Sequence, residues 1–291
     1  MGDDPVKAFE ANRRRLLGLA YRLLGEATEA EDVLQDAYLR WMNSHDVEKP
    51  EAWLTTVVTN LCLNRLTSAR ARREAYIGPW LPEPVITGDG ALGPLETVEQ
   101  RDSVSFGVLV LLERLTPPER AVFVLREAFG HPHREIAEIL GVDEAHSRQL
   151  HRRARERVAQ DTKRFDADRQ QQARIVQGLL AASADGDLDR LERMLADDVV
   201  AWSDGGGVGA ARRPVIGRDK VARYLLGLSR RPEVAPTTPT LAEVNGSVGV
   251  AFHEGDELRA VVALEVADGR VTAFRLVVNP AKLGFAARQL A

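Results

Sequence analysis

The chain has 291 residues, of which 44% are hydrophobic and 28% are charged, which predicts two or three globular domains and excludes a disordered chain. Its formal net charge is −4, and its single cysteine, Cys62, excludes an intrachain disulfide framework and a cysteine-based zinc site. The N-terminus lacks the apolar core of a signal peptide and no apolar run is long enough to span a membrane, so we expect a cytoplasmic protein without membrane association.

The net negative charge hides two basic segments. The stretch from Arg65 to Arg73 holds four arginines and no acidic residue, and Ser147–Arg164 holds seven basic residues against two acidic ones. Such clusters indicate local contacts with phosphate groups. On an acidic chain they also indicate that DNA binding is weak unless a larger partner contributes.

Three amphipathic helices are predicted before residue 75. The first covers residues 6–24, and the second is the segment AEDVLQDAYLRWM. A polar loop, Asn43–Pro50, leads to a third helix that starts at its proline, because proline is tolerated in a first helical turn. One face of this third helix, which includes Asn60 and Asn64, is mostly polar.

A linker is expected over residues 76–107, because its prolines and glycines forbid a long helix or strand. Within it lies the apolar patch Trp80-Leu81-Pro82. Two interpretations of this patch remain open. It is either a local tether to a neighbouring domain or a docking site whose release changes activity.

The most informative segment is Leu115–Val158. Thr116 predicts a helix start, since a proline follows it and a glutamate lies three residues on. Two short helical patterns then meet at Gly141, and Asp143 is expected to cap the second one. The basic side of that second helix consists of Arg148, Arg152 and Arg155, beside His151. This pattern is typical of a helix-turn-helix that presents a recognition helix to the major groove of DNA.

The C-terminal part, from about Asp166, predicts an α+β domain. Helices are expected over residues 170–182, 188–195 and 217–228. Strands are expected over residues 199–202, 244–253, 258–267 and 270–278, with an antiparallel sheet formed by the last three.

Residues 6–75 and 108–160 resemble regions two and four of an extracytoplasmic-function sigma factor of the sigma-70 family. The matching features are AEDVLQDAYLRW, PEAWLTTVVTNLCLNRLTSARARRE and LTPPERAVFVLRE…EIAEILG…RQLHRRAR, which are highly specific in this order. The remainder resembles the subgroup with a C-terminal SnoaL-like domain. The resemblance implies a multidomain chain: an all-α helical bundle (1–75), an all-α helix-turn-helix domain (108–164), and an α+β SnoaL-like domain shaped as a cone-like barrel (166–291).

The resemblance further implies a promoter-specificity subunit of RNA polymerase with three binding surfaces. Residues for the promoter −10 element are Asn60, Asn64, Arg65, Ser68 and Arg70, with the loop Asn43–Pro50 shaping a pocket for a flipped base. Residues for the −35 element are Arg134, Ser147, Arg148, His151, Arg152, Arg153 and Arg155. Residues for core RNA polymerase are Asp32, Gln35, Asp36, Leu39 and Trp41, which would bind the clamp helices of the β′ subunit, while the β flap is a second contact.

The SnoaL-like domain is implied to regulate the sigma regions in place of a separate anti-sigma factor, in a monomer. Its contact residues would be Trp80, Leu81, Pro82, Asp204, Gly205, Gly206, Gly207, Asn279, Pro280, Lys282 and Leu283. The sign of this regulation stays open.

Catalysis is not expected. Asp204 stands before three glycines, which suits a tight turn better than a catalytic pocket, and His253 lies at the end of a strand beside acidic residues. We expect no catalytic residue, no cofactor and no metal site. Two alternatives remain: an independent repressor or activator, and a SnoaL-type enzyme or ligand-sensing module fused to DNA-binding regions.

Overall fold

The computed structural model describes residues 4–45, 47–93, 95, 98–159, 169–207 and 209–291. The chain divides into two compact units, and both are discontinuous in sequence. The helical unit consists of Met1–Ala75 and Asp89–Thr162, and the α+β unit consists of Tyr76–Gly88 and Lys163–Ala291. The first half of the expected linker therefore belongs to the α+β unit.

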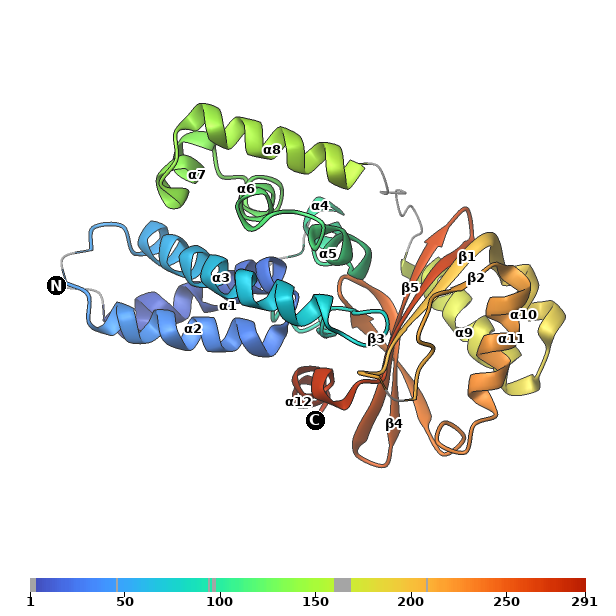
Figure 1. The fold of residues 1–291 in the computed structure, drawn as a ribbon. Coiled ribbons are helices and arrows are strands. Elements are labelled where there is room, and N and C mark those ends of the chain that lie inside the picture. Colours follow the sequence, from blue (N-terminus) through green and yellow to red (C-terminus); the bar gives the residue numbers. More distant parts are fainter. Residues whose placement is uncertain (1–3, 46, 94, 96–97, 160–168, 208) are drawn as a thin grey trace. The chain divides into compact units, whose positions relative to one another are not determined.

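The helical unit begins with a three-helix bundle (Figure 1). Its helices are α1 (Pro5–Leu24), α2 (Ala27–Met42) and α3 (Pro50–Glu74). Gly25 ends α1 in a left-handed conformation with φ of 72°, and Pro50 opens α3 as its sequence predicts. At one end of the bundle the rings of Trp41 and Trp53 pack with their centroids 5.6 Å apart. The bundle fixes which faces of α2 and α3 remain exposed.

The rest of the helical unit carries the helix-turn-helix. Its helices are α4 (Val98–Asp102), α5 (Phe106–Leu112), α6 (Pro117–Glu127), α7 (His133–Leu140) and α8 (Glu144–Ala159). Thr116 and Glu119 form the expected capping box of α6, and Gly141 ends α7 with φ of 65°. Leu150, Ala154 and Val158 are buried along one side of α8, so the opposite side faces outward.

The bundle and the helix-turn-helix contact each other through buried charges inside this unit. Arg120 of α6, only 2% exposed, donates from Nε and Nη2 to the carbonyl of Arg22 at 3.3 and 3.2 Å. Glu113 accepts hydrogen bonds from both Arg120 and Arg73, and Arg73 also pairs with Glu26 at 2.9 Å. Burial lowers the pKa of Arg120 because it penalises the charged guanidinium. These charges hold α1, α3 and α6 together.

The α+β unit is built on one six-stranded sheet in the order β2-β1-β6-β5-β4-β3. The strands are β1 (Leu195–Asp204), β2 (Val215–Ile216), β3 (Thr238–Val244), β4 (Ser247–Glu254), β5 (Glu257–Ala267) and β6 (Arg270–Val277). The antiparallel arrangement expected for the last three strands is confirmed, since β4 pairs with β5 and β5 with β6 in antiparallel fashion. Strand β1 pairs in parallel with β6 and antiparallel with β2, and β3 pairs antiparallel with β4.

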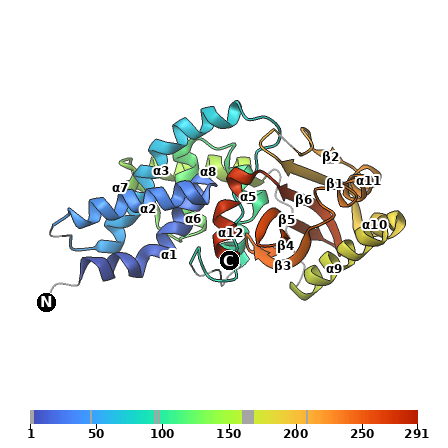
Figure 2. The ribbon, with the colours of Figure 1, turned by 90° about the horizontal axis from the view of Figure 1, so that it is seen from below.

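Helices cover the two faces of this sheet differently. Helices α9 (Arg169–Asp185), α10 (Leu188–Met194) and α11 (Arg218–Ser229) pack on one face and share the hydrophobic core with it (Figure 2). A short 3₁₀ helix, η1 (Pro280–Lys282), leads to α12 (Gly284–Leu290), which lies on the opposite side of the sheet. Because side chains alternate along a strand, Ala201 of β1 points into the core and Asp204 points to the opposite face.

The sequence prediction missed four elements of this unit, namely β2, β3, η1 and α12. The strand expected over 244–253 corresponds to β4, and the turn Asn245-Gly246, whose φ angles are 50° and 78°, joins it to β3. Positive φ at both turn residues is the mark of a type I′ hairpin. No helix in the described ranges is long and apolar enough to cross a membrane.

Candidate functional site

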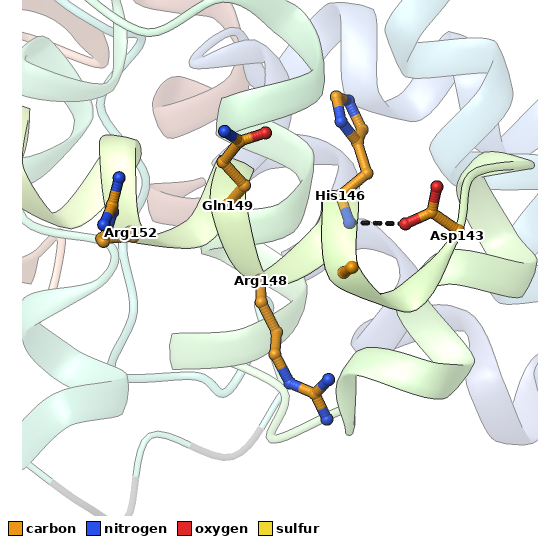
Figure 3. Close-up of a pocket in the computed structure, with 6 residues that line it drawn as sticks. Asp143, His146, Arg148, Gln149 and Arg152 are labelled. Atoms are coloured by element: carbon orange, nitrogen blue, oxygen red, sulfur yellow. Dashed lines mark hydrogen bonds between the residues drawn. The ribbon is translucent and has the colours of Figure 1, made fainter.

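The outward side of α8 forms a shallow basic depression on the helical unit. It has a volume of about 600 Å³ and is lined by Asp143, Ala145, His146, Arg148, Gln149 and Arg152 (Figure 3). The side chains of Arg148 and Arg152 are 61% and 73% exposed, and Arg153, Arg155 and Arg134 are exposed as well. Asp143 caps the helix, since its Oδ1 accepts from the backbone N–H of His146 at 2.7 Å. This side of α8 can therefore present hydrogen-bond donors to a ligand.

Two residues assigned to this surface from the sequence face the other way. Ser147 is fully buried, and its Oγ lies 3.0 Å from Nδ1 of His133. His151 pairs through Nε2 with Glu127 at 2.7 Å, and its ring packs against that of His133. Burial, and next to it the charge of His151, lowers the pKa of His133. Both residues support the turn between α7 and α8.

His146 and Gln149 take the exposed positions that sequence reasoning overlooked. Leu150, Ala154 and Val158 are buried, and Ser147, three residues before Leu150, lies on the same side of the helix. The same spacing leaves residues 145, 148, 149 and 152 on the outer side of the helix. The pattern was therefore present in the sequence.

A polar stripe runs along the exposed side of α3. Asn60, Asn64 and Ser68 lie four residues apart and are all exposed. Ser68 donates from Oγ to the carbonyl of Arg65 at 2.9 Å. Arg70 lies on α3, but its side chain is outside the described residues. Arg65 is not part of this stripe, since its guanidinium turns toward α2 and pairs with Glu29 and Asp36 there.

The outer side of α2 carries a second exposed stripe. It consists of Asp32, Gln35 and Leu39, with Asp36 half-buried beside them. Met42 continues it as an exposed apolar side chain that sequence reasoning did not select. Trp41 lies elsewhere: it is buried, and its Nε1 donates to the carbonyl of Pro5 at 2.7 Å. The tryptophan assigned to a binding face is thus part of the bundle core.

In the α+β unit a buried ion pair joins the linker to the sheet. Nζ of Lys282 lies 2.7 Å from Oδ2 of Asp204 and donates to the carbonyl of Leu81 at 2.6 Å. Oδ2 of Asp204 also accepts from the backbone N–H of Leu81 at 2.8 Å, and Oδ1 accepts from the hydroxyl of Tyr76. Lys282 Nζ lies 4.8 Å and 4.4 Å from the ring centroids of Tyr76 and Trp80. Three segments distant in sequence converge on this pair.

Glycines and an asparagine shape the surroundings of Asp204. Gly206 and Gly207 follow with φ of 62° and 95°, and a Cβ on Gly206 would lie 2.8 Å from Nδ2 of Asn279. Asn279 donates from Nδ2 to the hydroxyl of Tyr76 at 2.8 Å and caps η1 by accepting from the N–H of Ala281. The turn therefore needs glycine at position 206. Gly205 and Pro280 flank these contacts, while Pro82 and Leu283 are buried.

The linker continues along the edge of β3 and reaches α12. Val85 exchanges two hydrogen bonds with Asn245, at 3.0 and 2.9 Å. The backbone N–H of Ile86 donates to Oε1 of Gln289 at 2.9 Å, and Nε2 of Gln289 donates to the carbonyl of Ile86 at 2.8 Å. Neither Asn245 nor Gln289 was expected from the sequence. Residues 76–88 are therefore a structural part of the α+β unit, which we call the docked linker.

The residues considered for catalysis occupy ordinary structural positions. Both carboxylate oxygens of Asp204 already accept hydrogen bonds, from Tyr76, Leu81, Gly206 and Lys282. His253 lies half-buried on β4, and the turn that follows it is exposed. Across the described part of the chain, no group of three or more histidine, cysteine, aspartate or glutamate side chains is arranged to hold a metal ion.

Comparison with known proteins defines the class. A family model described as Sigma-70 region 2 matches residues 8–72, and one described as Sigma-70, region 4 matches residues 106–158. The chain is 43% identical, over 95% of its length and 92% of the relative's, to the ECF RNA polymerase sigma factor SigJ of Mycobacterium tuberculosis. It is 33% identical to the probable ECF RNA polymerase sigma factor SigI of the same species, over 96% of its own length and 95% of that protein's.

The crystal structure of M. tuberculosis SigJ superposes on the chain with a TM-score of 0.76, at 40% identity, covering 96% of this chain and 98% of that one. The chain belongs to the extracytoplasmic-function sigma factors of the sigma-70 family. It is accordingly a sigma factor, a subunit that directs core RNA polymerase to promoters. The predicted fold class of helical sigma domains followed by an α+β domain is confirmed.

The buried ion pair leads to a prediction about the docked linker. Replacing Lys282 by alanine leaves the carboxylate of Asp204 buried without its cation, which costs about 3–5 kcal/mol. We expect the K282A variant to lose hydrogen-exchange protection at the amides of Leu81 and Val85. The matched control is K220A on the exposed side of α11, which should behave as the unmodified chain. Full protection of both amides in K282A would contradict this role of the ion pair.

Proposed function

We propose that the outer side of α8 reads the promoter −35 element. An arginine can bond guanine at two points and a glutamine can do the same with adenine. Arg148, Gln149 and Arg152 are exposed on one side of α8 and support this assignment. Arg153 and Arg155 hold phosphates, and so does Arg134 at the start of α7. Ser147 and His151 leave the proposed set because they face the core.

The exposed side of α3 reads the −10 element in this proposal. The amides of Asn60 and Asn64 can hydrogen-bond the edges of unpaired bases, and Ser68 extends the same stripe by one turn. Arg70 follows on the same helix and would hold a phosphate. The loop after α2, between Asn43 and Pro50, would receive a flipped base.

The exposed side of α2 binds core RNA polymerase. It offers carboxylates at Asp32 and Asp36, an amide at Gln35 and the apolar side chains of Leu39 and Met42. A mixed stripe of this kind, with a small apolar centre and a charged rim, is typical of a protein interface. The clamp helices of the β′ subunit are the proposed partner, and the β flap would bind the helix-turn-helix part. The chain would act as a monomer in the cytoplasm.

Reading both elements requires the helical unit to open. The −10 and −35 elements lie roughly 25 base pairs apart, as their numbering indicates. This corresponds to about 85 Å of duplex at 3.4 Å per base pair. A compact unit of this size has a radius of gyration of about 15 Å and spans about 40 Å. In the helical unit α3 packs against α6 and α7, so the two reading helices belong to one compact body. Polymerase binding supplies the free energy for their separation.

The α+β unit regulates this opening in cis by holding the docked linker. Residues 76–88 lie between the two sigma regions in sequence and are bonded to the sheet by Asp204, Lys282 and Asn245. While residues 76–88 are docked, only residues 89–105 are available as a connecting segment when regions two and four move apart. Docking therefore restrains the sigma factor, and release of the linker favours the open form. A separate anti-sigma factor is not needed for such control.

Variants of α8 test the assignment of the −35 surface. R148A and Q149A should each lower run-off transcription with core polymerase by about 5- to 150-fold, the effect of losing a two-point base contact worth ~1–3 kcal/mol. Selection from a promoter library randomised at −35 should show altered base preference for Q149A.

The control for this test is H151A, which should keep the selected −35 sequence because His151 faces Glu127. A changed preference in H151A with none in Q149A would reverse the assignment. Tight binding to duplex promoter DNA without polymerase would instead favour an independent repressor or activator.

Release of the docked linker tests the regulatory proposal. W80A removes a ring that lies 4.4 Å from the Lys282 ammonium, an interaction worth ~1 kcal/mol. We expect run-off transcription with core polymerase to rise about fivefold, the population shift that this free energy provides. I216A, which changes an exposed apolar side chain on β2, is the control. Lower or unchanged transcription in W80A would show that docking does not restrain the protein.

A further inference from the structure

One guanidinium on α3 gathers three carboxylates of α2. Nη1 of Arg65 donates to Oε2 of Glu29 at 3.0 Å, and Nη2 donates to Oδ2 of Asp36 at 2.9 Å. The nearest oxygen of Asp32 lies 3.7 Å from Nη1. Glu29, Asp32 and Asp36 are spaced by three and four residues, so they share one side of α2. A planar fork of donors is suited to such a cluster, and an ammonium is not.

This cluster is not needed to hold α2 and α3 together. The two helices pack against each other, and Val33 and Leu34 of α2 and Val58 and Leu61 of α3 are buried. The Arg65 side chain is 27% exposed, and those of Asp36 and Asp32 are 47% and 59% exposed. Ion pairs with this degree of exposure add little to stability. The consequence of the contact is therefore the orientation of the carboxylates.

Without the guanidinium the three carboxylates would repel one another. Like charges three and four residues apart on a helix are unfavourable, so the side chains would turn away from each other. Two of them, Asp32 and Asp36, lie in the proposed polymerase-binding stripe. Arg65 itself points away from the stripe of Asn60 and Asn64, so it does not lie where a promoter phosphate would meet that stripe.

We infer that Arg65 is a positioning residue for polymerase binding, which fixes the carboxylates of Asp32 and Asp36 in the orientation that the polymerase recognises. It thereby connects the polymerase-binding face of α2 to the promoter-reading helix α3. This inference rests on the proposed function of the α2 stripe. It replaces the sequence-based assignment of Arg65 as a −10 phosphate contact.

The test is a double-mutant cycle in the full chain, with affinity for core polymerase measured by fluorescence anisotropy. R65A should weaken core binding by about five- to tenfold, the range typical of coupled neighbours. In the D32A/D36A background, which removes both carboxylates that Arg65 is proposed to orient, the same substitution should change the affinity less than twofold. R65K, which keeps the charge and loses the fork, should lie between R65A and the unmodified chain. R13A on α1, an exposed arginine, controls for the change in total charge.

A second measurement separates positioning from DNA contact. With core polymerase saturated, the holoenzyme should bind single-stranded −10 DNA with the same salt dependence for R65A as for the unmodified chain. An unchanged core affinity, combined with a slope of log affinity against log salt that falls by about 0.7, would make Arg65 a phosphate contact and overturn the inference. A loss of core affinity that is equally large in the D32A/D36A background would also overturn it.

The variant L39A distinguishes this inference from the proposed function on which it rests. If L39A weakens core binding and R65A does not, the α2 stripe binds polymerase and Arg65 has no positioning role. If neither variant changes core affinity, the polymerase surface lies elsewhere and both proposals fail. Circular dichroism at increasing temperature shows whether each variant keeps the folded bundle.

Discussion

The shared carboxylate of Glu113 is the contact on which the arrangement of the helical unit depends. Arg120 and Arg73 both donate to it, so the helix-turn-helix part and the three-helix bundle meet through buried charge. A buried ion pair adds little net stability, because desolvation offsets its attraction. When such a contact opens, its charged groups regain water. This chemistry is compatible with the opening of the helical unit that we propose.

The α+β unit includes a segment that lies between the two sigma regions in the sequence. Its docked linker comes from the middle of the chain, and the partner residues Asp204, Asn245 and Lys282 come from the C-terminal part. Burial of Tyr76, and then its hydrogen bond to Asp204, raises the pKa of the phenol, so the hydroxyl remains a donor at physiological pH.

Local signals made much of the fold predictable from the sequence. Thr116 and the residues after it predicted the start of α6 correctly, because the hydrogen bonds of a helix cap form among residues within one turn. Ser147 was misplaced because it lies three residues before the buried Leu150, on the same side of α8, and this position was not weighed when the basic surface was assigned. The hairpin at Asn245-Gly246 was missed even though its turn signal is strong. The partners of Leu81 and Arg65 were beyond prediction, since they depend on tertiary contacts between segments that are far apart in the chain.

The two reading helices are packed in one unit, and we propose that they separate when they act at a promoter. Fluorescent labels on T67C of α3 and E156C of α8, both exposed positions, report their distance by energy transfer. The native Cys62 is buried, and burial raises the pKa of its thiol, so it resists labelling. We expect a separation within about 40 Å in the free protein and about 85 Å in the complex with core polymerase and promoter DNA. A distance that stays the same in both states would contradict it.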